Sequence, residues 1–486
     1  MPQRVVSIGF SLRYRMEVAN FDGPAAERNV IDAVLQLKHI VDSHAEIERV
    51  DFSFGSVYED FREGFDAYNN ATFDDLDGAA VALLRLQDTY KVDTKSLAEE
   101  LRADDCFYVG HIALQKEKYY HLAIPWLQET EKRIDQGETL MGDRFNRSIL
   151  YNYLAFALRA TNNYAWAYHY LEKITLIDPD FPVEEYRNYT LTRMNEQQPH
   201  WNWNSNKTCN QLPAIKYAKP AQVDYLDIYE ALCRGERLQN PHQWIPDEKL
   251  QCYLKRDAAF LRLAPLKTEV LSRQPDILRF PGALSEAEVD LFLKFASEKL
   301  MEKAQVVTRT NSSYHADSRT AKHMVIPEYK HEVVKNFGIR MGHMTNLATE
   351  EQVSSEVLQI ANYGLGGHFV PHYDAFVPDD ITNDREIFKR SNEVFYGMGN
   401  RIGTVLIYLS EPKVGGATVF DEIRLTVPPK KGDAIFWYNL HRSGRPDLLT
   451  HHGGCPVFHG SKWVANKWYH EKGNEFNRPC SVNRDQ

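Results

Sequence analysis

The feature of this chain that most constrains its fold is a set of four residues in its last third: His372, Asp374, His452 and Lys462. Two imidazoles and one carboxylate form the facial triad that holds non-haem Fe(II) and leaves three coordination positions open. A lysine ten positions after the second histidine can neutralise the distal carboxylate of a co-substrate. The chain must therefore bring residues up to 90 positions apart to one point.

Short β-rich runs surround these four residues. The runs are "LQIANYGLGGHFVPHYD", "GTVLIYLS", "GGATVF", "DAIFWYNL" and "KWVANKWYHE", bounded by Gly, Pro and Asp. Many short strands separated by turns are typical of a sandwich or jelly roll. Residues i and i+2 of a strand share a face, so His372 and Asp374 can aim at one point. Because the chain has 18 histidines, a chance His-x-Asp is expected, but this setting predicts an Fe(II)/2-oxoglutarate oxygenase domain.

Longer strings carry a resemblance to a known family between about Gly78 and Cys480. They are "GAAVALLRLQDTY", "LCRGE", "NYGLGGHFVPHYD", "NRIGT", "GGATVF", "KKGDAIFWYNL", "HGGCPVFHGSKWVANKW" and "EFNRPC". In these strings the sequence resembles the α subunits of animal collagen prolyl 4-hydroxylases. The resemblance implies iron ligands at His372, Asp374 and His452 and 2-oxoglutarate contacts at Lys462 and Tyr363. It also implies that Arg401 and Trp468 line the peptide and co-substrate ends of the site.

Two nearby histidines compete for the second ligand position. His451 is adjacent to His452, and His459 lies three positions before Lys462. The family spacing of ten before the lysine selects His452. We expect surface or supporting positions for the other two.

The resemblance implies an activity and a set of partners. The expected reaction is 4-hydroxylation of proline in X-Pro-Gly repeats, with Fe(II) and L-ascorbate as cofactors and 2-oxoglutarate and O2 as co-substrates. The expected partners are a proline-rich, collagen-like peptide, a protein disulfide isomerase β subunit and a second α subunit. Two alternatives stay open: the same chemistry on a non-collagen peptide, and a peptide-binding subunit with a degenerate catalytic half.

The expected architecture is an α+β multidomain chain with four regions. Residues 1–75 are a helical, dimerisation-like region, and 76–195 are a tetratricopeptide-like, peptide-binding module. Residues 196–275 are a linker with a short helix. Residues 276–480 are a double-stranded β-helix (jelly-roll) oxygenase domain, whose first helix begins with the capping box Ser285 and Glu288.

An internal repeat supports the helical module. Tyr120 and Tyr164 begin similar segments 44 positions apart, and each follows another helix-period segment. We expect most of the repeated aromatic residues to pack in the core. In the resembled family this module binds proline-rich peptide, and Tyr153 and Phe156 fall on its aromatic groove positions. The later segment "VEEYRNYT" departs from the family's groove residues.

The six cysteines and five sequons fit an oxidising compartment. The resemblance implies two disulfides, Cys233–Cys252 and Cys455–Cys480, and we expect Cys106 to be a buried thiol in a helix. The candidate glycosylation sites are Asn70, Asn146, Asn188, Asn206 and Asn311. The resembled family works in the endoplasmic reticulum lumen.

The remaining features narrow the function classes. The first residues, "MPQRVVSIGFSLRYRMEV", lack the apolar core of a secretory signal, so we expect the sequence to begin downstream of the precursor's start. A net charge of −10 without a basic block disfavours nucleic acid as a partner. The sequence contains no apolar run of about 20 residues, so it predicts no membrane span.

The segment between His372 and Arg401 is longer than the family usually has. Arg401 lies 29 positions after His372, and the residues between them include "VPDDITNDREIFKRSNEVFYGMGN", which is polar and has two glycines near its end. We expect a loop there. Two interpretations stay open, a lid over the substrate and a surface insertion without a role in turnover.

Overall fold

The computed structural model describes most of the chain beyond residue 72. Described are residues 73–139, 146–197, 212–217, 219, 224–242, 251–297, 301–303, 306–307, 313–314, 319–380 and 382–482, with Ile31, Leu35 and Lys38. The predicted dimerisation region 1–75 lies almost wholly outside these residues, as do Asn70, Cys209, Asn206 and Asn311. Two compact units divide the chain, a helical one from Val30 to Val223 and a β-rich one from Asp224 onward.

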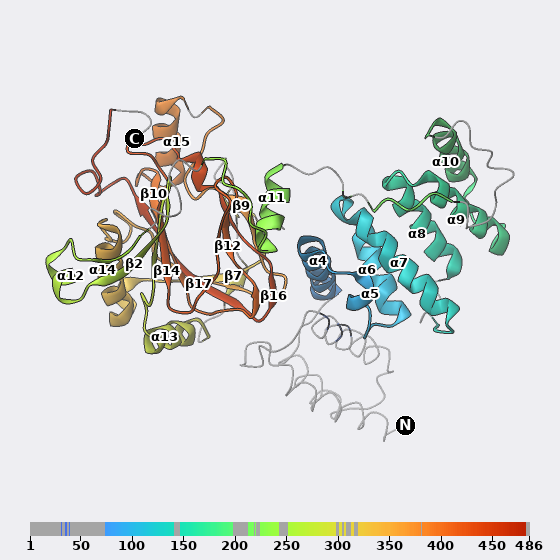
Figure 1. The fold of residues 1–486 in the computed structure, drawn as a ribbon, viewed down its shortest axis with the longest axis horizontal. Helices are drawn as coiled ribbons and strands as arrows, with labels where there is room; N and C mark the ends of the chain where they lie inside the picture. Colours follow the sequence, from blue (N-terminus) through green and yellow to red (C-terminus); the bar gives the residue numbers. More distant parts are fainter. Residues whose placement is uncertain are drawn as a thin grey trace, which may run out of the picture. The chain divides into compact units, whose positions relative to one another are not determined.

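The helical unit is built from helices that follow one another along the chain (Figure 1). They are α4 (Phe73–Tyr90), α5 (Thr94–Leu97), α6 (Ala103–Leu114), η1 (Glu117–Tyr119), α7 (Tyr120–Asp135), α8 (Arg147–Ala160), α9 (Tyr164–Ile177) and α10 (Glu184–Gln197). Helix α6 packs against α7, α8 against α9, and α10 against α9. These helix pairs confirm the predicted tetratricopeptide-like module.

The repeated residues form the core of this unit. Ala123 and Ala167 are fully buried at equivalent places in α7 and α9, so the two helices of each pair approach closely. Trp126 is fully buried and its indole N–H donates to Gln87 Oε1 at 2.7 Å. Asn146 accepts from the backbone N–H of Ile149 and caps the start of α8. The expectation that most repeated aromatic residues are core residues fits this packing.

The β-rich unit holds two facing sheets. The large sheet has the order β1-β2-β3-β14-β10-β17-β8-β7-β4, and the small sheet has the order β13-β12-β15-β9. The large-sheet strands are β1 (Cys252–Lys255), β2 (Leu266–Arg273), β3 (Asp276–Phe280), β14 (Ala434–Tyr438), β10 (Arg401–Tyr408), β17 (Lys462–His470), β8 (Leu358–Tyr363), β7 (Lys322–Ile326) and β4 (Glu302–Lys303). The small-sheet strands are β13 (Leu425–Val427), β12 (Thr418–Phe420), β15 (His452–Gly454) and β9 (Phe369–His372). Strands β11 (Val414–Gly415) with β16 (Val457–His459), and β5 (Val306–Val307) with β6 (Ser313–Tyr314), form two further pairs.

Side chains alternate between two cores on the faces of the large sheet. On one face, Val405 and Ile360 pack with Phe292 of α13 (Glu286–Ser297) and Phe337 of α14 (Glu332–Thr345). On the other, Tyr363, Tyr408 and Trp437 pack with Phe420 of the small sheet. These layers confirm the predicted jelly-roll oxygenase domain. In the described part of the chain, no helix is long and apolar enough to cross a bilayer.

The predicted linker, residues 196–275, overlaps with the first elements of the β-rich unit. Residues 224–275 include α11 (Asp224–Cys233), β1, α12 (Ala259–Leu263) and β2, all within the β-rich unit. Strands β1 and β2 extend the large sheet beyond β3, with Cys252 opposite Glu269. The segment lacks a clear hydrophobic period, because β1 is a mostly exposed edge strand and β2 is largely half-buried, and both gain their order from pairing, β1 with β2 and β2 with β3.

The expected disulfide pairing is wrong. Cys233 at the end of α11 bonds to Cys455, just after β15, with a Cα–Cα distance of 5.4 Å. Cys252 and Cys480 are free and exposed, and Cys106 is free and buried, as expected. Helix α11 contacts β9, β12 and β13 of the small sheet, whereas Cys252 begins the outermost strand of the large sheet. The two cysteines closest in sequence therefore lie on different parts of the fold.

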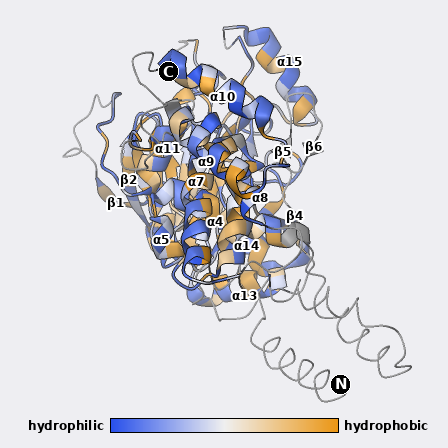
Figure 2. Ribbon diagram, turned by 90° about the vertical axis from the view of Figure 1, so that its right-hand side faces the viewer, coloured by the Kyte–Doolittle hydropathy of each residue, from blue (hydrophilic) through white to orange (hydrophobic). Residues whose placement is uncertain are grey.

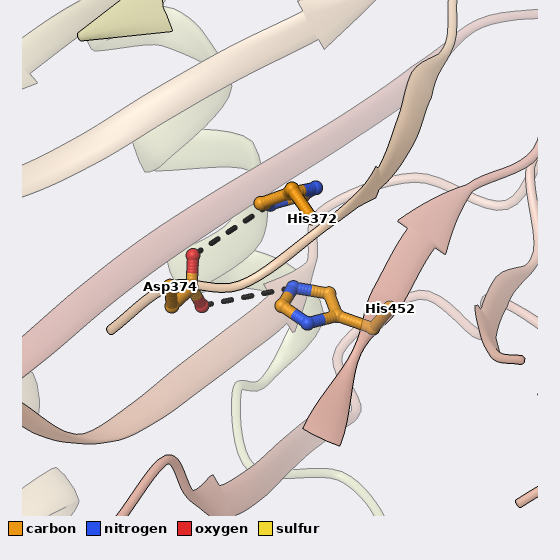
Figure 3. A group of neighbouring side chains, drawn as sticks. All are labelled: His372, Asp374 and His452. Carbon is orange, nitrogen blue, oxygen red and sulfur yellow. Dashed lines mark ion pairs between the residues drawn. The ribbon is translucent and has the colours of Figure 1, made fainter. Parts of the chain in front are cut away.

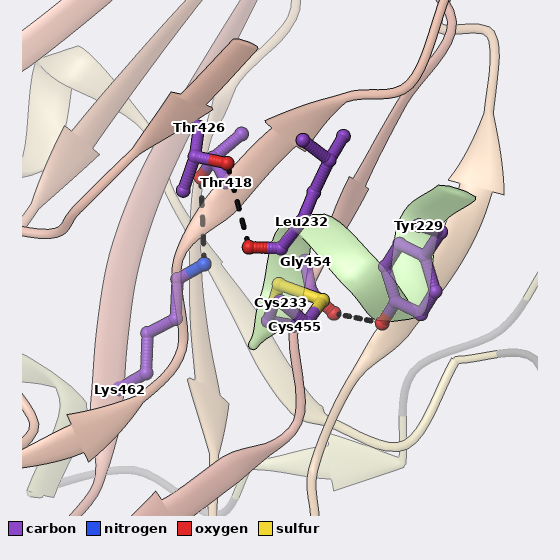
Figure 4. The surroundings of a disulfide bond; sticks show 8 residues. All are labelled: Tyr229, Leu232, Cys233, Thr418, Thr426, Gly454, Cys455 and Lys462. Atoms are coloured by element: carbon purple, nitrogen blue, oxygen red, sulfur yellow. Dashed lines mark hydrogen bonds between the residues drawn. A yellow bond between two sulfur atoms is a disulfide. The ribbon is translucent and has the colours of Figure 1, made fainter. Parts of the chain in front are cut away.

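Hydrogen bonds support the observed pairing. The Tyr229 hydroxyl donates to the carbonyl of Gly454 at 2.8 Å, and the Thr426 hydroxyl reaches the carbonyl of Leu232 at 3.4 Å (Figure 4).

Burial raises the pKa of the Cys106 thiol to about 12, so this thiol stays protonated and unreactive at neutral pH.

We predict that a non-reducing digest links the peptides of Cys233 and Cys455, whereas Cys252 and Cys480 react with an alkylating reagent in the folded protein. The bond closes a loop with a sequence separation of 222 residues. Replacing both cysteines with serine should lower the free energy of unfolding by about 2–4 kcal/mol, measured by denaturant titration. The Cys252→Ser, Cys480→Ser variant is the matched control. A peptide linking Cys233 to Cys252 would contradict the structure.

Candidate active site

The three predicted metal ligands converge at the edge of the small sheet. Strands β9 and β15 are antiparallel neighbours, and their register sets His372 opposite His452. Asp374 follows two residues later and turns towards both rings (Figure 3). Its carboxylate oxygens lie 3.7 Å from Nε2 of His372 and 3.7 Å from Nε2 of His452. One ligand atom from each residue falls within 4.8 Å of the others, a spacing that suits a single ion.

Backbone carbonyls fix the orientation of both imidazoles. Nδ1 of His372 lies 2.9 Å from the carbonyl oxygen of Val370, and Nδ1 of His452 lies 2.9 Å from that of Thr450. Since a carbonyl only accepts, each Nδ1 carries the proton and donates it. Each Nε2 is then unprotonated, and its lone pair faces the carboxylate of Asp374. This arrangement is typical of metal-binding histidines.

The charges of the three groups also suit a divalent cation. Burial alone would raise the pKa of Asp374, but His452, His372 and Arg401 hold the pKa of this carboxyl well below its usual range. Burial, with a further contribution from the nearby His372, lowers the pKa of His452 to about 4. At neutral pH the site therefore offers an ionised carboxylate and a neutral His452 imidazole as donors.

Two residues that sequence reasoning missed hold the carboxylate in place. The hydroxyl of Thr404 donates to Oδ2 of Asp374 at 2.7 Å, and Asn439 Nδ2 donates to the Thr404 hydroxyl oxygen at 2.9 Å. Thr404 lies on β10 two residues before Leu406, and both line the same pocket. The period-2 pattern of "RIGTVLIY" could have marked Thr404 as a residue facing the site.

Lys462 lies in the wall of the same pocket as the triad. Strand β17 directs Lys462, Val464, Asn466 and Trp468 to the pocket, while the alternate Ala465 and Tyr469 join the opposite core. Lys462 is 3% exposed, and its Nζ lies 3.5 Å from the hydroxyl of Thr418 (Figure 4). Among the residues that the structure describes, no carboxylate pairs with it.

The surroundings of Lys462 are aromatic. Its Nζ lies 5.7 Å from the ring centre of Tyr363 and 5.8 Å from that of Tyr408. Tyr363 is its cross-strand neighbour on β8. Burial lowers the pKa of Lys462 to about 7. A buried ammonium with one weak hydroxyl contact is suited to receiving an anion.

Arg401 and Trp468 occupy different positions around the pocket. Trp468 lines it, whereas the guanidinium of Arg401 lies over the Trp468 ring at 4.3 Å and over Phe395 at 4.9 Å. Arg401 makes two hydrogen bonds to Glu356, at 2.5 and 3.1 Å, and one to the carbonyl of Asp374 at 3.3 Å. Arg401 thus holds in place the segment after β9 that carries Asp374.

Glu356, which the sequence did not identify, holds the Arg401 guanidinium in this position. Burial would raise the pKa of its carboxyl, but Arg401 and the hydrogen bond from His470 lower the pKa to about 2. His470 Nε2 lies 3.1 Å from the Glu356 carboxylate. The ion pair stays intact at neutral pH.

The two other histidines have separate surroundings. Nδ1 of His451 lies 2.8 Å from the carboxylate of Asp421, and the centre of its ring lies 4.5 Å from that of Tyr373. His459 ends β16 and does not line the pocket. Neither imidazole joins the cluster of His372, Asp374 and His452.

The longer segment before Arg401 contains a helix, so the expected loop is only partly correct. Helix α15 (Asp384–Val394) begins at Asn383, whose side chain accepts from the N–H of Glu386. Arg445 holds its first residue, Asp384, at 2.7 Å. Figure 2 shows α15 as mostly hydrophilic. The sequence predicted a loop because most residues of α15 are charged or polar and only Ile387 and Ser391 are buried.

The helical unit carries a second hollow. Tyr153 and Phe156 line a groove of about 610 Å³ together with His111, Arg159, Tyr186 and Tyr189. Tyr153 stacks on His111, with ring centres 5.3 Å apart. The two predicted groove residues therefore lie in one groove. Arg159 was not predicted there, and neither were Tyr186 and Tyr189, which lie in the segment that departs from the family pattern.

Comparisons with known proteins agree with both units. Residues 358–470 match the 2OG-Fe(II) oxygenase superfamily, and residues 103–196 match the prolyl 4-hydroxylase peptide-substrate-binding domain. A solved structure of a viral collagen prolyl hydroxylase from Paramecium bursaria Chlorella virus-1 is 24% identical, covering 40% of this chain and 94% of that chain with a TM-score of 0.31. At that score the likeness carries no conclusion.

Whole-chain similarity decides the family. The chain is 36% identical to prolyl 4-hydroxylase subunit alpha-1 of Caenorhabditis elegans, covering 93% of this chain and 80% of that protein. It is 33% identical to prolyl 4-hydroxylase subunit alpha-1 of Homo sapiens, covering 93% of this chain and 84% of that protein. The chain therefore belongs to the prolyl 4-hydroxylase alpha-subunit family and is a 2-oxoglutarate- and Fe(II)-dependent dioxygenase.

Proposed function

We propose that this chain is a catalytic subunit that hydroxylates C4 of prolyl residues in X-Pro-Gly repeats of collagen-like peptides. The observation that carries the proposal is one pocket whose wall holds both a His-Asp-His cluster and a buried lysine without a carboxylate partner among the described residues. A metal ion and a dicarboxylate with one distal carboxylate fit these two features together. The relatives named prolyl 4-hydroxylase support proline as the substrate residue.

In this proposal His372, Asp374 and His452 hold Fe(II) on one face. Iron bound there supplies the activation of dioxygen that is coupled to decarboxylation of 2-oxoglutarate to succinate. The chain's own residues orient the donors: Val370 and Thr450 fix the two imidazoles, and Thr404 fixes the carboxylate. The metal site is thereby shaped before the ion arrives.

Lys462 recognises the distal carboxylate of 2-oxoglutarate. Thr418 and Tyr363 flank its ammonium, so the distal carboxylate would lie in a largely water-free pocket. Charge-assisted hydrogen bonds are about twice as strong as neutral ones. The pairing also removes the cost of leaving the ammonium buried without an anion.

The peptide makes two kinds of contact in this proposal. Trp468, at the pocket wall, lies against the prolyl residue, while Arg401 holds the tryptophan and the Asp374 carbonyl in position. The groove of Tyr153 and Phe156 in the helical unit binds a further stretch of the same proline-rich chain. Aromatic grooves suit the preformed polyproline II helix.

The proposed cellular setting rests on the resemblance to the family. We expect L-ascorbate to restore iron oxidised in unproductive turnovers and a disulfide isomerase β subunit to accompany the chain. We expect action in the endoplasmic reticulum lumen, where the Cys233–Cys455 bond persists. Glycosylation of Asn146 or Asn188, both exposed, and dimerisation through residues 1–75 remain predictions.

Turnover with a synthetic peptide tests the proposed function. Incubation of the chain with its β subunit, Fe(II), ascorbate, 2-oxoglutarate and (Pro-Pro-Gly)n should yield peptide heavier by one oxygen atom on the proline before glycine. Succinate should form in equal amount with hydroxyproline. Succinate formed without peptide oxidation, at a rate that the peptide does not change, would exclude this peptide class as the substrate.

We predict that His372→Ala, Asp374→Ala and His452→Ala each abolish turnover, because each removes a ligand of the metal. Fe(II) affinity, measured by titration under anaerobic conditions, should fall at least tenfold. His459→Ala is the control, since this residue does not line the pocket. Full activity of His452→Ala together with loss of activity in His451→Ala would move the ligand assignment by one residue.

We predict that Lys462→Met raises the KM for 2-oxoglutarate by about 30-fold or more, because the distal carboxylate loses its charge partner. Fe(II) affinity should be unchanged. The matched control is Lys431→Met, since Lys431 forms an ion pair with Asp290 at the surface. A normal KM for 2-oxoglutarate in Lys462→Met would remove this residue from the site.

The same variant should show a pH signature without co-substrate. Burial lowers the pKa of Lys462 from 10.5 to about 7, so between these values the unfolded chain binds more protons at this residue. The contribution of Lys462 to the free energy of unfolding therefore rises with pH in this window. Lys462→Met should be more stable than the wild type near pH 7, and the advantage should shrink towards pH 10.5.

A further inference from the structure

The groove of the helical unit contains a positive charge that its walls do not neutralise. Helix α8 presents Tyr153, Phe156 and Arg159 at steps of three residues, which places them along one side of the helix. Among the described residues that line this groove, none is aspartate or glutamate. The groove is therefore aromatic with a single cationic end.

Arg159 is held by rings and has no ion-pair partner among the described residues. Its guanidinium lies 4.6 Å from the ring centre of Tyr186 and 6.0 Å from that of Phe156. Its Nε is buried without a hydrogen-bond partner. Burial lowers the pKa of Arg159 from a very high starting value, so the guanidinium stays charged at neutral pH.

Neighbouring cations of the same unit are neutralised. Arg187 pairs with Glu172 at 3.3 Å, Lys173 with Glu131 at 2.8 Å, and Arg147 with Asp135 at 2.7 Å. The three pairs show that carboxylates are available on these helices. Arg159, inside the groove, is therefore available to pair with an anion of a bound ligand.

We propose that this groove selects proline-rich substrate peptides that carry an acidic side chain, whose carboxylate pairs with Arg159. The inference rests on the proposed function and specifies the class of peptide that the groove takes. The other groove residues supply rings for proline and hydrogen-bond donors, but no second charge of either sign at neutral pH. Burial lowers the pKa of His111, so this groove residue stays neutral.

The spacing of the groove agrees with a polyproline II ligand. Tyr153 and Arg159 are six residues apart on α8, which is about 9 Å along the helix axis. One turn of polyproline II covers three residues and also rises about 9 Å. A proline on the Tyr153 ring thus sets the residue one turn away beside Arg159. A glutamate at that place reaches the guanidinium.

Binding of matched peptides tests this inference. Fluorescein-labelled Pro-Pro-Gly repeats with a single glutamate, glutamine or lysine in place of one X-position proline differ only in charge. Anisotropy titrations with the full chain should show the glutamate peptide binding about fivefold more tightly than the glutamine peptide. The lysine peptide should bind most weakly. The preference for glutamate should decrease at high salt.

Variants at the two arginines separate the charge from the fold. Arg159→Gln should remove the preference for glutamate and leave the affinity for the glutamine peptide within about twofold, because the aromatic rings remain. Arg159→Lys should retain part of the preference. Arg187→Gln, which breaks a surface pair outside the groove, should retain all of it. In turnover, the glutamate peptide should have a lower KM and an unchanged kcat.

Two results would overturn the inference in different ways. If the glutamine and glutamate peptides bind the wild-type chain equally, Arg159 does not select an acid, while the proposed function stands. If none of the peptides binds, the peptide-binding role of the groove fails and the inference fails with it.

Discussion

The active site depends on one register between two short strands. Strands β9 and β15 are three or four residues long, yet their pairing sets His372 directly opposite His452. Directly opposed side chains of antiparallel strands lie about 5 Å apart at Cβ, which is the span that one metal ion bridges. A slip by one residue would turn an imidazole to the opposite face. The large sheet behind them, with Lys462 and Trp468 on alternate positions of β17, then completes the pocket.

The buried charged side chains near these two strands fall into two groups, those stabilised by neighbouring residues and one that is not. Asp374 is stabilised by His452, His372 and Arg401, and Glu356 by Arg401. Lys462 has no such compensation among the described residues, and the desolvation of its ammonium lowers its pKa. A fold keeps an uncompensated buried cation at a cost in stability. The cost is offset only when an anionic ligand occupies the pocket.

Sequence patterns predicted the residues that act through local spacing. The His372-x-Asp374 pair, the jelly-roll strands and the helical repeats all have a period that a single sequence displays. Thr404, Glu356 and Asn439 lie in different parts of the chain, and their roles arise from contacts across 30 or more positions. The predicted disulfide pairing was wrong for the same reason, since Cys233 lies next to Cys455 because α11 packs on the small sheet. Strands β1 and β2 were missed because β1 is mostly exposed and β2 largely half-buried, so neither shows a strong hydrophobic alternation.

The disulfide also changes how the polypeptide is covalently connected. The bond between Cys233 and Cys455 closes the backbone into a covalent ring. All three residues of the His-Asp-His cluster lie inside the ring, and Lys462 lies seven residues outside it. A single backbone cut within the ring leaves the two pieces attached to each other, with the cluster on one connected molecule. A cut between Cys455 and Lys462 instead releases β17, and with it the strand that carries the co-substrate's partner.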